Sequence, residues 1–217
     1  MKYLIFGGIL CVFLNTNLWG QHSISINGGW TYSNLYQLAT KEAFEASYYH
    51  KELFDFGVVH MPFLGMKYEY IYHSLRLSTG INVLSMGANH YYLEGAENIY
   101  MYLTFPIIVG YQFNFKNNYS LVLEGGVEGG TSIANVGSVV ALARYKQTRP
   151  YIGLLLGLEG KYKRFSLGAK FHLGLNVFDK FVFGATYDDD TLYFKHIGGT
   201  VYLGYTLWNS SQSKKEQ

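Results

Sequence analysis

Apolar and polar residues alternate strictly along residues 165–177, which read F-S-L-G-A-K-F-H-L-G-L-N-V. Every odd position is apolar, and every even position is small, polar or charged. This period of two predicts a β-strand, because successive side chains of a strand point to opposite faces. At thirteen residues the segment is about twice as long as a usual globular strand. Such a strand needs apolar surroundings on one side and polar surroundings on the other.

The same alternation recurs along the chain and predicts eight strands in all. They cover residues 23–32, 56–70, 75–83, 98–115, 119–129, 151–162, 165–177 and 194–208. Very short connections at residues 72–74, 116–118 and 163–164 join them in pairs, and longer connections separate the pairs. Short and long connections alternate in this way in membrane barrels, with turns on the periplasmic side and loops outside.

The predicted fold class is therefore all-β: an eight-stranded antiparallel up-and-down transmembrane β-barrel with three short periplasmic turns and four longer extracellular loops. Closure into a barrel pairs both edges of every strand, which removes the unpaired backbone groups that lipid cannot satisfy. Residues 35–55, 85–97 and 131–149 are expected to form irregular connections, because the alternation is lost there.

Alternation alone does not say which face points outward. A soluble lipocalin-type barrel also has eight strands and keeps its apolar face inside, and Gly28-Gly29-Trp30 supplies the G-x-W that lipocalins carry on their first strand. Three features favour the membrane barrel. The polar face is rich in Gly, Ser and Thr, which fit a narrow interior. Its few charges have both signs, and aromatic residues gather near the strand ends.

The composition indicates a protein with fewer charged surface residues than a soluble domain carries. Charged residues make up 15% of the 217 residues and aromatic residues 18%, whereas soluble domains average about 25% charged residues. A formal net charge of +2 gives no reason to expect nucleic acid as a partner. The single cysteine, Cys11, lies in the N-terminal apolar segment, so a mature chain without that segment would contain no thiol.

Three regions are predicted along the chain. Residues 1–20 have one lysine followed by the apolar run 3–14, which is the length of a signal-peptide core and short for a membrane helix. Residues 21–208 form the barrel domain. Residues 209–217 form a polar C-terminal tail.

Candidate catalytic and metal-binding groups are few. His172 and His196 fall on the polar faces of the last two strands and could form a relay with Glu159, although a hydrogen-bonded interior is the favoured interpretation. His60 falls on the lipid-facing side of the second strand, where a hydrolase would need a serine beside it, and none has the required position. Asp188, Asp189 and Asp190 could bind calcium but lack EF-hand spacing. The sequence therefore predicts no enzyme, no catalytic residues, no cofactor and no metal.

The strongest constellation is a set of charged residues on the polar face, predicted to form a structural network in the lumen: Lys67, Glu69, Arg76, Glu124, Glu128, Glu159, Lys161, Lys170 and His172. Neighbouring strands are expected to offer opposite charges to one another. One interpretation is a charge-lined conduction path. The favoured interpretation is a salt-bridged filling, because eight strands leave an interior only wide enough for side chains.

Several segments resemble the PorT-like outer-membrane β-barrel family. N-I-Y-M-Y-L-T-F-P-I-I-V-G-Y-Q-F at 98–113 is similar to the family's Y-x-x-I-P-x-x-x-x-Y-x-F strand. Residues 151–175 resemble its G-x-G-x-E hairpin, and H-I-G-G-T-V-Y-L-G-Y-T-L-W at 196–208 resembles its closing strand. The family usually ends on the terminal aromatic residue that the assembly machinery recognises, whereas nine residues follow Trp208 here.

The resemblance implies a non-enzymatic envelope component in the outer membrane of a Gram-negative bacterium, with a role in secretion or envelope assembly. Its expected partners are outer-membrane lipid, the barrel assembly machinery and proteins that bind the extracellular loops. The alternatives are a membrane-embedded lipid-modifying enzyme, a small pore, and a soluble lipocalin-type binding barrel.

Overall fold

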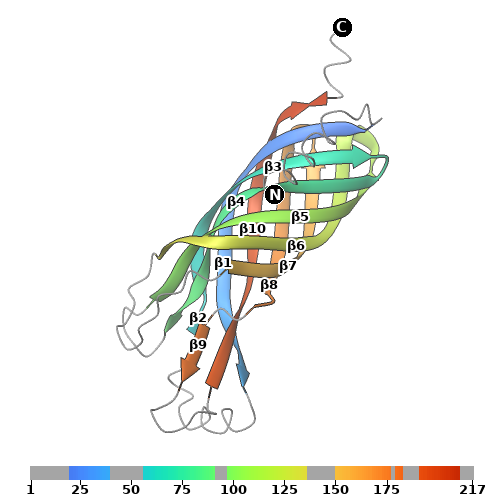
Figure 1. Cartoon of the computed structure of the whole chain (residues 1–217). Coiled ribbons are helices and arrows are strands. Elements are labelled where there is room, and N and C mark those ends of the chain that lie inside the picture. Colours follow the sequence, from blue (N-terminus) through green and yellow to red (C-terminus); the bar gives the residue numbers. More distant parts are fainter. Residues whose placement is uncertain are drawn as a thin grey trace, which may run out of the picture.

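Eight long antiparallel strands close into a barrel (Figure 1). The computed structural model describes residues 20–39, 56–90, 97–135, 150–176, 179–182 and 191–210. The barrel strands are β1 (Gln21–Ala39), β3 (Val59–Tyr72), β4 (Leu75–His90), β5 (Glu97–Asn114), β6 (Tyr119–Asn135), β7 (Pro150–Tyr162), β8 (Phe165–Gly174) and β10 (Thr191–Asn209). They pair in this order, and β10 pairs back onto β1. The predicted fold class is therefore confirmed.

All three predicted short turns are present, and they lie at the same end of the barrel (Figure 1). Residues 73–74 join β3 to β4, the 3-10 turn η2 (Lys116–Asn118) joins β5 to β6, and residues 163–164 join β7 to β8. Each turn contains at least one residue in the left-handed region, and in η2 these are Asn117 and Asn118, with φ of 64° and 63°. Asparagine tolerates this conformation better than most residues, which suits it to the turn. We call this end of the barrel the short-turn end.

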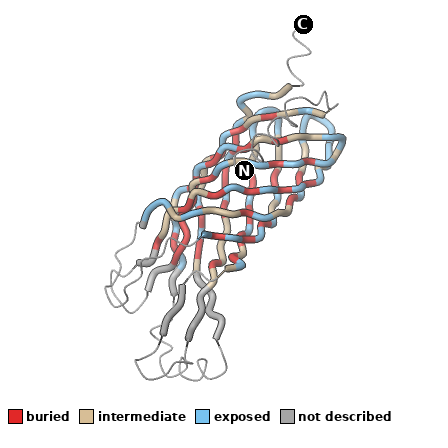
Figure 2. Tube along the Cα trace, viewed as in Figure 1, coloured by how far each residue is buried: buried red, intermediate tan, exposed pale blue. Residues whose placement is uncertain are grey.

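The apolar rows of the strands face outward, and the polar rows face inward. Along β1, Ser25, Asn27 and Thr31 are buried in the barrel, whereas Ile26 and Trp30 are exposed on its outside. The same alternation of buried and exposed positions runs along the other strands (Figure 2). The apolar exterior is the arrangement that a lipid environment requires, and the reverse of a lipocalin. Among the described residues, no helix is long and apolar enough to span a membrane.

Several strands extend beyond their predicted limits at the end opposite the short turns, which we call the loop end. β1 continues to Ala39, β4 to His90 and β6 to Asn135, so the irregular connections expected from residues 35, 85 and 131 begin later than predicted. β8 ends at Gly174 rather than at residue 177. These extensions lack the continuous apolar row on which the strand predictions rest, which is why the alternation missed them.

Two short strands also lie at the loop end (Figure 1). β2 (Phe56–Gly57) pairs with β4 and falls at the start of the strand predicted over 56–70. β9 (Asp179–Val182) pairs with β10 and lies in the longer connection between the strands predicted over 165–177 and 194–208. The expected final strand begins three residues earlier than predicted, at Thr191, and ends at Asn209, one residue into the predicted tail. The predicted signal peptide falls almost entirely outside the described residues.

Pro106 sits in the middle of β5, where its missing N–H interrupts the ladder with β4. The pairing runs from Leu75 to Thr79, skips the next two residues of β4, and resumes at Asn82. The Thr79 hydroxyl donates to the Pro106 carbonyl oxygen at 2.9 Å. A side chain thus satisfies a backbone acceptor that would otherwise be costly to leave unpaired in lipid.

Candidate functional site

The largest group of interior charges is a cluster of two acids and three cations, which we call the ion-pair cluster: Lys67, Glu69, Arg76, Glu159 and Lys161. The Lys67 ammonium lies 2.9 Å from Glu69 and 2.5 Å from Glu159. The Lys161 ammonium lies 2.6 Å from Glu69 and 3.2 Å from Glu159. Arg76 also pairs with both carboxylates. Each acid is therefore shared by all three cations.

Three of the six contacts in this cluster reach across the barrel. Lys67 and Glu69 lie on β3 and Arg76 on β4, whereas Glu159 and Lys161 lie on β7. Four steps in the ring separate β3 from β7, so these strands face one another. Arg76 on β4 and Glu69 on β3 pair between neighbouring strands, as expected, whereas the cross-lumen contacts join strands that are not neighbours. The interior is narrow enough for long side chains to meet near the barrel axis.

Two further side chains complete the cluster, and the sequence analysis did not identify either. The Tyr202 hydroxyl donates to Glu159 Oε2 at 2.7 Å, and the Ser23 hydroxyl donates to Glu69 Oε2 at 3.1 Å. Gly168 lies on β8 beside the Tyr202 ring, where an added Cβ would come within 2.3 Å of it. A glycine that faces inward opposite a large inward-facing ring is the sequence signal that could have located Tyr202.

We expect Gly168→Ala to destabilise the barrel by about 1–3 kcal/mol, because the methyl group would force the Tyr202 ring away from Glu159. Gly160→Ala is the matched control, since the outward-facing Gly160 has its nearest atom 3.9 Å from an added Cβ. Urea titration of the folded protein in lipid vesicles, followed by tryptophan fluorescence, measures both changes. Equal unfolding midpoints for the two variants would show that Tyr202 has room to move.

A second contact joins Lys170 on β8 to Glu124 on β6, with 3.2 Å between the ammonium and the carboxylate. The Lys170 ammonium also lies 5.3 Å from the centroid of the Tyr202 ring, within cation–π range. Tyr202 therefore contacts both the ion-pair cluster and this pair. The two sets of charges form one continuous packed region.

A third group surrounds His172. Its Nδ1 lies 2.7 Å from Glu128 Oε1, and its Nε2 lies 2.9 Å from the Thr200 hydroxyl. The Tyr151 hydroxyl donates to the same Glu128 oxygen at 2.9 Å. His172 thus lies in a hydrogen-bonded interior, the interpretation that the sequence favoured, and its acid partner is Glu128 rather than the Glu159 of the alternative relay. Thr200 and Tyr151 were not identified from the sequence.

The order carboxylate, imidazole, hydroxyl in this group is the order of a hydrolase triad. Chemistry at Thr200 would require a substrate to reach its hydroxyl. Glu128, His172 and Thr200 are each at most 2% exposed, and Thr200 Oγ1 lies 3.3 Å from the Thr31 hydroxyl. The geometry suits a hydrogen-bonded brace between β6, β8, β10 and β1 better than a reaction centre.

Of the remaining candidates, His196 lies beside the His172 group and His60 lies on the outside of the barrel. His196 is buried, with its ring edge-on to Tyr151 at 5.9 Å between centroids. His60 is on the outside of β3, as its position in the alternation indicates, and packs edge-on against Tyr32 at 4.9 Å. The acidic run 188–190 lies outside the described residues. In the described part of the chain, no group of three or more His, Cys, Asp or Glu is placed to hold a metal ion.

The structure places all nine residues of the predicted lumen set inside the barrel. Four cations and four carboxylates balance in number, and His172 joins them. Beyond these charges, toward the loop end, buried apolar side chains continue the filling: Phe63, Leu84, Met86, Ile99 and Tyr102. The barrel interior is therefore packed with side chains through both regions. Its charged groups pair with one another, whereas Ser25 Oγ, Asn27 Oδ1 and Thr104 Oγ1 are buried without a hydrogen-bond partner among the described residues.

Fold and interior together define a closed eight-stranded antiparallel β-barrel with an apolar exterior and a side-chain-filled polar interior. No protein-family model matches the sequence, and no curated protein matches it. The resemblance to PorT-like proteins therefore stays a prediction.

Among solved structures, the chain is similar to the N-terminal β-barrel domain of Pseudomonas aeruginosa OprF, with 10% identity and a TM-score of 0.42 over 87% of this chain and 99% of that chain. Neisserial surface protein A has 9% identity and a TM-score of 0.44 over 86% and 98%. Ail, the attachment invasion locus protein of Yersinia pestis, has 15% identity and a TM-score of 0.40 over 87% and 99%.

Proposed function

We propose that this chain is a non-enzymatic barrel of the Gram-negative outer membrane that serves as a structural or accessory component of the envelope and does not conduct solutes. The observation that carries the proposal is the pairing of an apolar exterior with an interior closed by the ion-pair cluster. A lipid-facing exterior requires a membrane, and eight strands with a filled interior leave no aqueous path.

Burial of the acid–histidine–hydroxyl group supports the absence of an enzymatic role, since substrate has no access to Thr200. His60 has a tyrosine ring beside it rather than a serine.

The resemblance to PorT-like barrels extends the proposal to secretion or envelope assembly. On this proposal the partners are outer-membrane lipid, the barrel assembly machinery, and proteins that bind the extracellular loops, with no cofactor.

Purified protein in planar lipid bilayers should give no discrete conductance steps, because the ion-pair cluster blocks the lumen. The sample must first show two mobilities on a detergent gel, one before and one after boiling, which demonstrates that the closed barrel is present. A porin reconstituted in the same bilayer is the positive control for insertion.

Two results would contradict the proposal. Reproducible conductance steps from a heat-modifiable sample would favour the small pore. Hydrolysis of phospholipid in detergent that is lost in His60→Ala or in His172→Ala would favour the membrane-embedded enzyme.

A further inference from the structure

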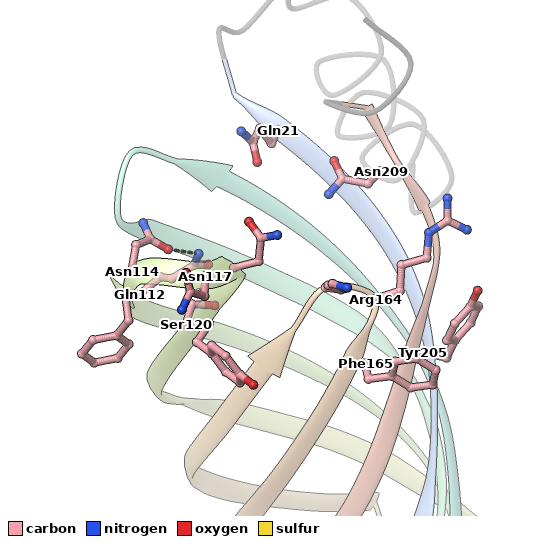
Figure 3. Close-up of a pocket in the computed structure, with 13 residues that line it drawn as sticks. Gln21, Gln112, Asn114, Asn117, Ser120, Arg164, Phe165, Tyr205 and Asn209 are labelled. Atoms are coloured by element: carbon pink, nitrogen blue, oxygen red, sulfur yellow. Dashed lines mark hydrogen bonds between the residues drawn. The ribbon is translucent and has the colours of Figure 1, made fainter. Parts of the chain in front are cut away.

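A pocket of about 1040 Å³ lies across the mouth of the barrel at the short-turn end (Figure 3). Its walls come from opposite sides of the ring: Gln21 is on β1 and Ser120 is on β6, four strands away. We propose that this pocket, which we call the mouth pocket, binds a water-soluble anionic polyol, that is, a sugar carrying a carboxylate or a phosphate. This site is independent of the function proposed above and lies outside the packed lumen.

Amide side chains dominate the polar part of the wall: Gln21, Gln112, Asn114, Asn117, Asn118 and Asn209. Each amide offers both donors and an acceptor, which is the complement of a hydroxyl group that donates and accepts. Gln112 donates to Asn114 at 2.5 Å, while its own oxygen is shielded from water and accepts no hydrogen bond from the described residues. A ligand hydroxyl could satisfy this oxygen after rotation of the amide. A ring of amides thus favours a ligand with several hydroxyls.

The charged residues of the mouth pocket favour a ligand that is an anion. Lys163 and Arg164, on the turn between β7 and β8, are the charged residues of the wall, and none of the described residues that line the pocket is acidic. Lys161 pairs in the β6–β7 ladder with Ser120 of the wall, and its side chain is 17% exposed. It belongs to the ion-pair cluster, where three cations face two carboxylates. Lys163 and Arg164 therefore supply the positive charge that attracts an anion into the pocket.

The position of the mouth pocket favours a soluble ligand over a lipid headgroup. Lipid headgroups surround the outside of a barrel, whereas this pocket spans its mouth from β1 to β6. Outward-facing rings at its edge, among them Tyr119 and Phe165, mark the aromatic row at this end of the exterior. The pocket volume is at the upper end of the range of small-molecule sites, about 300–1,000 Å³, which is enough for a sugar of more than one ring.

Binding can be measured by titrating the ¹⁵N-labelled full chain with glucuronate or with glucose 6-phosphate, and following the side-chain amide signals of Asn and Gln. Micelles of an uncharged ethylene-glycol detergent avoid the competing sugar headgroups of maltoside detergents. We expect saturable shifts with both anionic sugars and at least tenfold weaker binding of glucose. Saturation by only one of the two would identify whether a carboxylate or a phosphate is recognised.

Arg164→Gln should weaken binding about tenfold, as expected when a charge-assisted hydrogen bond is lost. Lys195→Gln, which removes the same charge near the loop end of β10, is the matched control and should bind as the unchanged protein does. Equal binding of glucose and glucuronate, or equal weakening by the two variants, would overturn the site. So would inorganic phosphate binding as tightly as glucose 6-phosphate, because the amides would then contribute nothing.

Discussion

Glu159→Gln is expected to lower the free energy of unfolding by about 3–5 kcal/mol, the usual loss when one partner of a buried ion pair is removed. Glu159 is fully buried and contacts all three cations of the ion-pair cluster. After the substitution, Glu69 alone would face them. The unfolding midpoint in urea, measured in lipid vesicles, should fall, and the heat-modifiable band should convert at a lower temperature.

Two comparisons make this test specific. Glu124→Gln removes a carboxylate that pairs with Lys170 alone, so we expect a smaller loss. Adding Lys67→Met to Glu159→Gln removes part of the surplus charge and should restore stability, which a double-mutant cycle would quantify. If the double variant were as unstable as the sum of the single variants, the contact between Lys67 and Glu159 would not contribute.

Strand number, antiparallel order and the inward or outward direction of each side chain could be predicted from the sequence, because all three follow from a period of two. Within residues 165–177 the pattern assigned Leu167 and Phe171 to the outside and Lys170 and His172 to the inside, and the structure agrees. A one-residue slip would reverse every assignment along a strand, so a clean alternation leaves little freedom.

Which inward side chains meet could not be predicted in the same way. Contacts across the lumen depend on the tilt of the strands and the width of the barrel. The alternation of apolar and polar residues specifies neither. For this reason the sequence left open an alternative in which Glu159 meets His172 and His196, whereas it meets Lys67 on the opposite wall. Tyr202 and Thr200 were missed because an isolated hydroxyl on a polar face gives no indication of its partner.

The positions at which strands end at the loop end could not be predicted from the sequence either. The alternation is sharp where buried and exposed positions alternate along a strand. It is lost where consecutive residues are alike in burial, as over 84–87, all of which are buried. β4 illustrates this: its predicted part ends at Val83, and the strand continues through Ser85 and Gly87 to His90. Backbone pairing with β5 maintains the strand there without an apolar row.

Leu203→Arg is expected to destabilise the protein in lipid vesicles by about 2–4 kcal/mol, the cost of arginine on the lipid face near the bilayer midplane. Leu203 is 67% exposed and lies in the central part of the outer row of β10. Leu75→Arg is the matched control, because Leu75 is 56% exposed beside the short turn between β3 and β4, near the membrane surface. There the same substitution should cost at most about 1 kcal/mol.

The contrast between the two leucines, rather than either value alone, tests the membrane assignment. Exposure of both side chains is similar, so a barrel surrounded by water would tolerate arginine equally well at the two positions. Lipid distinguishes them, since an arginine near the surface can extend its guanidinium to the headgroups and one near the centre must draw water or headgroups inward. Urea titrations in vesicles that give equal and small losses for both variants would contradict a lipid-facing exterior.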